Sequence, residues 1–130
     1  MRRILIDTNI YAAFMLNVPE VVSILSFAEQ IFISPVVLGE LLSGFKFGAK
    51  EKKNRNELER FLDNSHVNEV SIDSETSEFY SEIYRLLRSK GKPVPSNDMW
   101  IAASAMQHGL ALCTLDAHFD NIEGLARVRL

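Results

Sequence analysis

Short apolar segments alternate with longer amphipathic segments along the chain. The short segments have the length and apolar content of buried strands, and they predict strands at residues 3–7, 31–34, 67–72, 111–115 and 126–130. The longer segments carry apolar residues at helical spacing, and they predict helices at residues 9–16, 19–30, 35–44, 50–64, 74–90 and 98–108. Strands separated by helices are typical of α/β proteins. We therefore expect one domain over residues 1–130, with a mostly parallel central sheet of about five strands and helices on both faces.

Local signals support several of these boundaries. Ser34 precedes a proline, which is the arrangement of a helix N-cap followed by proline at the first helical position. Asp73 or the serine after it is expected to cap the long helix, and Gly109 is expected to end the last one. The final strand would be an edge strand with Arg127 and Arg129 pointing outward.

Composition narrows the class of protein. A chain of 130 residues with 47% hydrophobic residues can bury a core without disulfides. The formal net charge of -3 argues against a protein that grips nucleic acid mainly through a basic surface, but not against an enzyme that contacts nucleic acid locally. The single cysteine, Cys113, lies in an apolar run and is expected to be a buried thiol. Without a membrane-length apolar run or a secretory leader, we expect a cytoplasmic protein.

Four acidic residues stand where the predicted fold would bring them together. Asp7 and Asp116 each follow an apolar strand. Glu40 lies within the first two turns of the helix after the strand at 31–34, and Asp98 opens the helix after a proline-rich loop. Sites in open parallel sheets form beyond the carboxyl ends of the strands, where the strand order reverses. We therefore expect the four carboxylates to face one cleft.

Such a cluster favours a hard divalent cation. Carboxylates at close range raise one another's pKa and repel, and Mg²⁺ or Mn²⁺ bound by carboxylate and water oxygens relieves this repulsion. A zinc-type site is not expected, because the cysteine is alone and the histidines lack ligand spacing to one another. His118 is expected to be an exposed loop residue. Each acid taken singly has a simpler role as a helix cap or turn residue, but four at one edge indicate a metal site.

Four segments also resemble the motif regions of PIN-domain nucleases, in order and approximate spacing. They are "LIDTN" (5–9), "SPVVLGELLSG" (34–44), "PSNDMWIAASA" (95–105) and "LCTLDAHFDNIEGL" (112–125). The resemblance covers essentially the whole chain and is strongest to the small VapC-type toxins of toxin–antitoxin pairs. It implies a single PIN-like domain.

The resemblance also implies roles for particular residues. The implied catalytic and metal-binding quartet is Asp7, Glu40, Asp98 and Asp116. Thr8 and Asn9 would complete the first motif, the Thr114 hydroxyl would orient Asp116, and Asp120 would add a water-mediated contact. One departure is Trp100, where the family more often has a small aliphatic residue.

The activity implied by this family is hydrolysis of RNA phosphodiester bonds by an endoribonuclease that depends on Mg²⁺ or Mn²⁺ and leaves a 5′-phosphate. The implied partners are an RNA substrate, a VapB-like antitoxin protein and a second copy of the chain in a homodimer. The same cluster is compatible in outline with a PIN-fold module that binds RNA or protein without catalysis. A Mg²⁺-dependent phosphatase of the haloacid-dehalogenase type is a further alternative, but it requires a second aspartate at the position of Asn9.

The surface residues leave two interpretations open. Basic residues cluster in the run 46–55 and at Arg85, Arg88, Lys90 and Lys92. They either guide RNA phosphates toward the cleft or form solvated helix faces. Phenylalanines at helix or strand spacing are expected in the core, namely Phe14, Phe27, Phe32 and Phe45. Phe45 and Phe47, which lie beside lysines, are alternatively an exposed docking surface.

Overall fold

Five parallel strands form the centre of the computed structural model, which describes residues 2–128 and 130. They are β1 (Arg3–Ile6), β2 (Gln30–Ile33), β3 (Val67–Glu69), β4 (Ala111–Cys113) and β5 (Arg127–Val128). The strand order is β3-β2-β1-β4-β5, and every pairing is parallel. The α/β class and the five-stranded sheet expected from the sequence are confirmed.

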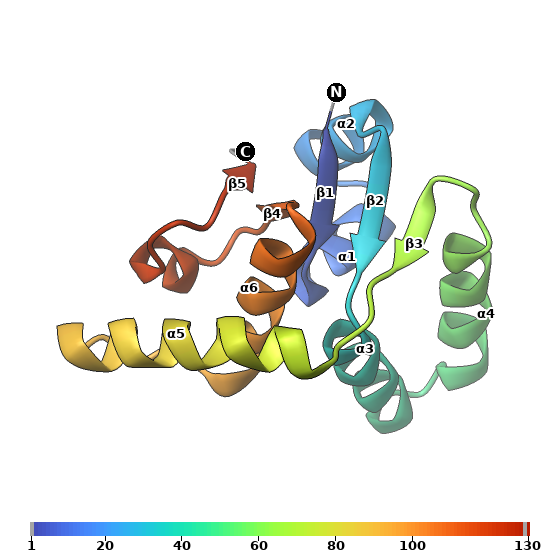
Figure 1. The fold of residues 1–130 in the computed structure, drawn as a ribbon. Helices are drawn as coiled ribbons and strands as arrows, with labels where there is room; N and C mark the ends of the chain where they lie inside the picture. The colour runs from blue at the N-terminus through green and yellow to red at the C-terminus, as the bar shows by residue number, and fades with distance from the viewer. Residues whose placement is uncertain (1, 129) are drawn as a thin grey trace.

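Six α-helices and one 3₁₀-helix connect these strands in the described residues. They are α1 (Thr8–Met15), α2 (Pro19–Phe27), α3 (Pro35–Phe47), α4 (Glu51–Leu62), α5 (Ser74–Lys90), α6 (Ser96–His108) and η1 (Ala117–Asn121). Figure 1 shows α1 and α2 behind the sheet and α6 in front of it. Helices therefore cover both faces, as expected when right-handed crossovers run in both directions from a central strand.

The central strand, β1, is the point where the strand order reverses. The chain moves from β1 to β2 and β3 in one direction, and β4 then pairs with the opposite side of β1. Ile4, Leu5 and Ile6 on β1 are fully buried, since the strand has neighbours on both sides and helices on both faces. The carboxyl ends of β1 and β4 thus form the crevice in which doubly wound folds place their sites.

Side-chain caps start several helices as the sequence predicts. Ser34 accepts a hydrogen bond from the Val36 N–H at 3.1 Å at the start of α3. Asp73 caps α5 in a capping box with Thr76. Asp7 caps α1, since its carboxylate accepts from the Ile10 N–H at 3.0 Å. The simple capping role of Asp7 is therefore real, and it coexists with the position that the metal-site hypothesis needs.

Some boundaries differ from the predictions because strand pairing decides them. The helix expected to reach residue 30 ends at Phe27, since Gln30 pairs with Arg3 and begins β2. The strand expected over 67–72 ends at Glu69, which pairs with Ile33 at the very end of β2. β4 and β5 are likewise shorter than expected, and the predicted outward side chain at residue 129 lies outside the described residues.

Two helix boundaries were also misplaced. The helix expected to end near Gly44 continues to Phe47, because Gly44 keeps ordinary helical backbone and the chain leaves the helix only at Gly48. The helix expected to open at Asp98 begins at Ser96, so Asp98 lies in its first turn. The 3₁₀-helix η1 was not predicted.

The prediction that Phe27 belongs to the core is wrong. Its side chain is 84% exposed, because the buried stripe of α2 runs through Val21 and Leu25 and Phe27 lies on another side of the helix. The other expected core phenylalanines pack against the core, as partly buried residues: Phe14, Phe32 and Phe45. Phe47 is 96% exposed, so only one of the two residues of the alternative docking surface faces solvent fully.

No single helix among the described residues has the length and apolar composition to cross a membrane. In this part of the chain, the one helix pair that passes the test when taken together is α1 with α2, and these helices are bent by 107° relative to each other.

Candidate active site

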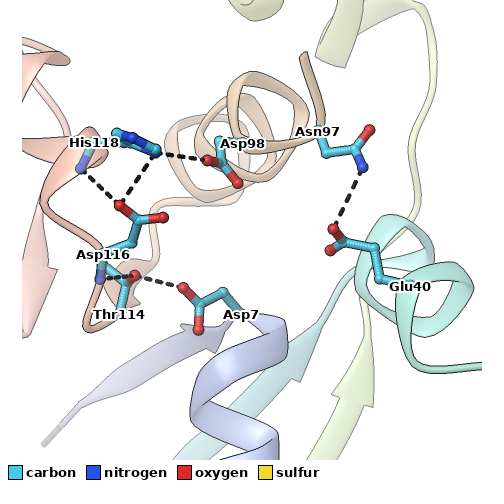
Figure 2. Close-up of polar contacts among 7 residues, drawn as sticks. All are labelled: Asp7, Glu40, Asn97, Asp98, Thr114, Asp116 and His118. Atoms are coloured by element: carbon cyan, nitrogen blue, oxygen red, sulfur yellow. Dashed lines mark hydrogen bonds and ion pairs between the residues drawn. The ribbon is translucent and has the colours of Figure 1, made fainter. Parts of the chain in front are cut away.

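Asp7 occupies the carboxyl end of β1 and is almost fully buried, with 5% of its surface exposed. One carboxylate oxygen accepts the Ile10 N–H, and the other accepts the hydroxyl proton of Thr114 from the loop after β4. The Thr114 hydroxyl in turn accepts the Asp116 backbone N–H at 3.0 Å. Thr114 therefore connects the two strand-end aspartates (Figure 2). Its side chain orients Asp7 directly and fixes the backbone of Asp116.

Glu40 reaches the same region from the second turn of α3. Its Oε1 accepts the Thr8 hydroxyl at 2.7 Å, and its Oε2 accepts the Asn97 side-chain amide at 3.4 Å. The turn of α3 before Glu40 is largely apolar and half-buried, and Glu40 is itself partly buried. A carboxylate in such surroundings needs polar partners, and these two hydrogen bonds provide them. The glutamate is thus held between the first turns of α1 and α6.

Asp98, Asp116 and His118 form the other half of the cluster. The His118 Nδ1 lies 3.2 Å from the Asp116 carboxylate and 3.6 Å from that of Asp98, and ligand atoms of all three residues lie within 4.8 Å of one another. Asp116 also accepts the His118 backbone N–H at 2.8 Å, which begins η1. The expectation that His118 is exposed is confirmed, but the residue does not lie apart from the acidic cluster, because the tight turn of η1 directs its imidazole onto both aspartates.

These residues border one open cleft of about 320 Å³. Its polar lining consists of Asp7, Thr8, Asn9, Glu40, Asn97, Asp98, Asp116 and His118. At about 30 Å³ per water molecule, the cleft has room for a cation with several bound waters. The four expected carboxylates, contributed by four separate elements, therefore do meet at the predicted edge of the sheet.

The electrostatics of the cleft are those of crowded anions. Burial raises the pKa of Asp7 above its usual value, and the charges of Asp116 and Glu40 raise it further, while hydrogen bonds from Thr114 and Ile10 oppose the shift. Burial also raises the pKa of Asp98, with a further contribution from the charge of Asp116. Both raised pKa values mean that ionising these carboxylates together costs free energy when no cation is bound between them.

The donor set fits a hard divalent cation. Carboxylate oxygens dominate the lining, and Cys113 is buried with its pKa raised to about 12, so no thiolate is available. A cation between the carboxylates would offset the repulsion that raises the pKa of Asp7 and Asp98. His118 adds an imidazole nitrogen, which Mn²⁺ accepts more readily than Mg²⁺.

Asp120 lies apart from the cleft. It sits on η1, and its carboxylate pairs with the Arg127 guanidinium at the start of β5. It borders a neighbouring hollow that also contains Asp116. Asp120 therefore does not line the cleft itself, and its expected water-mediated contact with the metal site stays a prediction.

Trp100, the departure from the family pattern, is accommodated by α5. Its ring stacks on Tyr80, with 4.3 Å between the ring centroids. The pair lies where α5 and α6 pack together, so the large side chain adds to the contact between these helices.

Comparison with known proteins identifies the family and the fold. Residues 4–125 match the family described as PIN domain. This match covers most of the chain, and the chain therefore belongs to the PIN-domain family.

Several of the relatives are named as VapC ribonucleases. The chain is 33% identical over 84 residues to Ribonuclease VapC4 of Mycobacterium tuberculosis, an alignment that covers 65% of each chain. It is 27% identical over 128 residues to Ribonuclease VapC2 of Rickettsia felis, covering 95% of this chain and 90% of the relative. A solved structure of VapBC2 from Rickettsia felis, bound to a DNA fragment from its promoter, superimposes with a TM-score of 0.87, 26% identity and 97% coverage of both chains.

Proposed function

We propose that this protein is a VapC-type PIN ribonuclease, the toxin of a toxin–antitoxin pair, and that it hydrolyses RNA with Mg²⁺ or Mn²⁺ held in the cleft. The observation that carries the proposal is the convergence of four carboxylates at the β1–β4 crevice of a PIN-family chain. The curated relatives named as ribonucleases support RNA as the substrate.

The proposed roles follow from the geometry. Asp7, Asp98 and Asp116 would hold the cation directly, because all three line the cleft and the charge of Asp116 contributes to the raised pKa of both other aspartates. When bound, the cation would lower the pKa of a coordinated water and offset charge on the phosphate oxygens. Glu40, kept in place by Thr8 and the Asn97 amide, would accept the proton of the attacking water or complete the ligand set. The product would carry a 5′-phosphate.

Thr114 would act as a positioning residue. Its hydroxyl donates to Asp7 and accepts from the Asp116 backbone, so it would keep both aspartates aligned. Asn9 lines the cleft and would contact the substrate or a bound water.

The partner of this chain would be a VapB-like antitoxin. VapBC complexes among the solved structures support this proposal. An arginine of the antitoxin would suit the cleft, since a guanidinium forms charge-assisted hydrogen bonds with carboxylates. The homodimer and the cytoplasmic location remain predictions.

The test is cleavage of a purified cellular RNA mixture by the wild type and by Asp98→Asn, each with Mg²⁺, Mn²⁺ or a chelator. Asp63→Asn is the matched control, because it makes the same chemical change at an exposed residue at the end of α4. We expect discrete cuts by the wild type and the control with metal, and a loss of at least about 100-fold in Asp98→Asn. Equal cleavage by wild type and Asp98→Asn would refute the proposal. RNA binding without cleavage by the wild type would instead support the binding-module alternative.

A further inference from the structure

Three arginines border a second hollow, at the edge of the sheet opposite the acidic cleft. Arg2 and Arg3 lie at the start of β1, and Arg127 lies at the start of β5. Together they line a depression of about 620 Å³ whose other lining residues are apolar or glycine. No carboxylate is among these lining residues, although the chain as a whole has a net charge of -3. The hollow therefore concentrates positive charge on an otherwise acidic protein.

Ion pairs with carboxylates occupy some of the basic residues in the two segments singled out from the sequence. Glu51 pairs with both Lys46 and Arg55, and Glu82 pairs with Arg85. Within residues 2–128 and 130, Arg2 and Arg3 make no ion pair with a carboxylate. Arg3 instead lies over the Phe32 ring, 5.2 Å from its centroid, which leaves its N–H donors available. Arg2 and Arg3 therefore present two guanidinium groups without a carboxylate partner in the described residues, and they share one hollow with Arg127.

A third hollow connects the arginines to the acidic cleft. It has a volume of about 670 Å³ and is enclosed by the loop after β4, by η1 and by β5. Asp116 borders both this hollow and the cleft, and Arg127 borders both this hollow and the arginine-lined depression. The Asp120 carboxylate pairs with Arg127 from η1 and fixes the direction of its guanidinium. A path therefore leads from Asp116 past Arg127 to Arg2 and Arg3.

We propose that this path binds the phosphate backbone of the substrate RNA on one side of the cut, with Arg127, Arg2 and Arg3 as the phosphate-binding residues. This inference rests on the proposed ribonuclease function. Guanidinium groups form paired hydrogen bonds with phosphate oxygens, so successive arginines suit a polyanion that leaves the cleft. Asp120 is then a positioning residue for Arg127, which accounts for its place outside the acidic cleft.

The test measures RNA binding in the cleavage-deficient Asp98→Asn background and cleavage in the otherwise wild-type protein. The variant is Arg2→Gln/Arg3→Gln/Arg127→Gln. The control variant is Arg85→Gln/Arg88→Gln/Lys92→Gln. It removes the same number of positive charges from the basic residues at the end of α5 and in the loop after it. The probe is a single-stranded RNA that contains a mapped cleavage site in its middle, with a truncated RNA that ends near the cut as a second probe.

We expect the arginine variant to reduce the slope of log Kd against log salt concentration by about 2, since each phosphate contact on single-stranded nucleic acid contributes about 0.7. Its KM for the long RNA should rise roughly tenfold or more, with kcat changed by less than about twofold, because the contacts act on binding rather than on the reacting phosphate. The rise in KM should be smaller for the truncated RNA when it lacks the nucleotides that would lie along the arginine path. Asp120→Asn should raise KM by a smaller factor.

An unchanged salt slope and KM in the arginine variant would overturn the inference, as would an equal effect in the control. A variant that cleaves RNA normally but no longer binds the antitoxin would also overturn it, and would assign the hollow to the protein partner. These outcomes are distinct from failure of the proposed function, in which wild type and Asp98→Asn act alike on every RNA.

Discussion

Asp7 combines a structural role and a proposed chemical role in one side chain. One carboxylate oxygen caps α1, and the other accepts the Thr114 hydroxyl at the β4 side of the crevice. Asp98 and Asp116 have a comparable dual position, in the first turn of α6 and at the start of η1. Because helix starts supply N–H donors and a positive dipole end, they hold carboxylates in fixed directions even when these repel one another.

The crowding of these acids predicts a change of stability with pH. Burial raises the pKa of Asp98, so the Asp98 carboxyl holds its proton more tightly in the folded protein than in the unfolded chain. At neutral pH the carboxyl is ionised in both states, and the cost of this buried charge lowers the free energy of unfolding. We expect metal-free Asp98→Asn to melt a few degrees above the wild type at pH 7. The difference should shrink as pH falls through the raised pKa toward about 3.9, the value for an unfolded aspartate, because the wild type becomes protonated. Calorimetry in chelator checks this, and a lower melting temperature for Asp98→Asn at pH 7 would contradict it.

Tyr11 offers a second test at the level of one atom. Its hydroxyl is buried and has no hydrogen-bond partner among the described residues, and burial with the nearby Glu57 charge raises its pKa to about 12. Its ring packs edge-on against Phe61, 5.2 Å between centroids. Tyr11→Phe keeps this packing and removes the unpaired hydroxyl, so the free energy of unfolding should rise by about 1 kcal/mol. Urea denaturation measures the change, and destabilisation would reveal a partner for the hydroxyl in solution.

At the scale of elements, the turn from α6 into β4 sets the position of Thr114 and Asp116. Gly109 ends α6 with φ 65°, a left-handed conformation that side chains disfavour, although a Cβ there would meet no atom within 4 Å. Gly109→Ala should therefore lower the free energy of unfolding by about 1 kcal/mol through backbone strain alone. Gly44→Ala is the matched control, since Gly44 lies in ordinary helical backbone with equally open space, and alanine should stabilise α3 by about 0.5–1 kcal/mol. Equal effects of the two substitutions in urea denaturation would disprove this account.

Near the same end of α6, hydrogen bonds also hold α5 and α6 together. The Asp73 cap of α5 also accepts the Gln107 amide of α6 at 2.9 Å, and Gln107 accepts the buried Thr76 hydroxyl. Tyr80 and Trp100 stack between the same helices. This packing fixes the first turn of α6, and with it Asp98, relative to the sheet.

At the scale of the whole molecule, the cleft is a site that a cation would stabilise. Because folding brings the carboxylates together, a cation that binds only the folded state raises stability by mass action, about 2.7 kcal/mol at 100 times its Kd. We expect Mg²⁺ or Mn²⁺ to raise the melting temperature of the wild type by several degrees, and a chelator to reverse this. In Asp98→Asn/Asp116→Asn the rise should be absent. An equal rise in that variant would place the binding elsewhere.

How far the sequence predicts the site depends on the kind of signal. Asp7, Glu40, Asp98 and Asp116 follow strand ends or open helices, so the rule for parallel sheets was enough to place them at one edge. His118 was missed because its contact depends on η1, a short turn without hydrophobic periodicity. Phe27 was wrongly expected in the core for a related reason. Apolar periodicity along α2 does not show which apolar side chains the rest of the fold leaves exposed to solvent.

The sequence by itself determined the order of the elements, the α/β class and the four acids, because apolar periodicity, caps and turn residues are local properties of the chain. The tertiary structure decided which side of β1 receives β4, how Thr114 couples Asp7 to Asp116, and that Arg2, Arg3 and Arg127 share one hollow. These features join residues about a hundred positions apart, and their distances follow from strand register and helix packing rather than from any local preference.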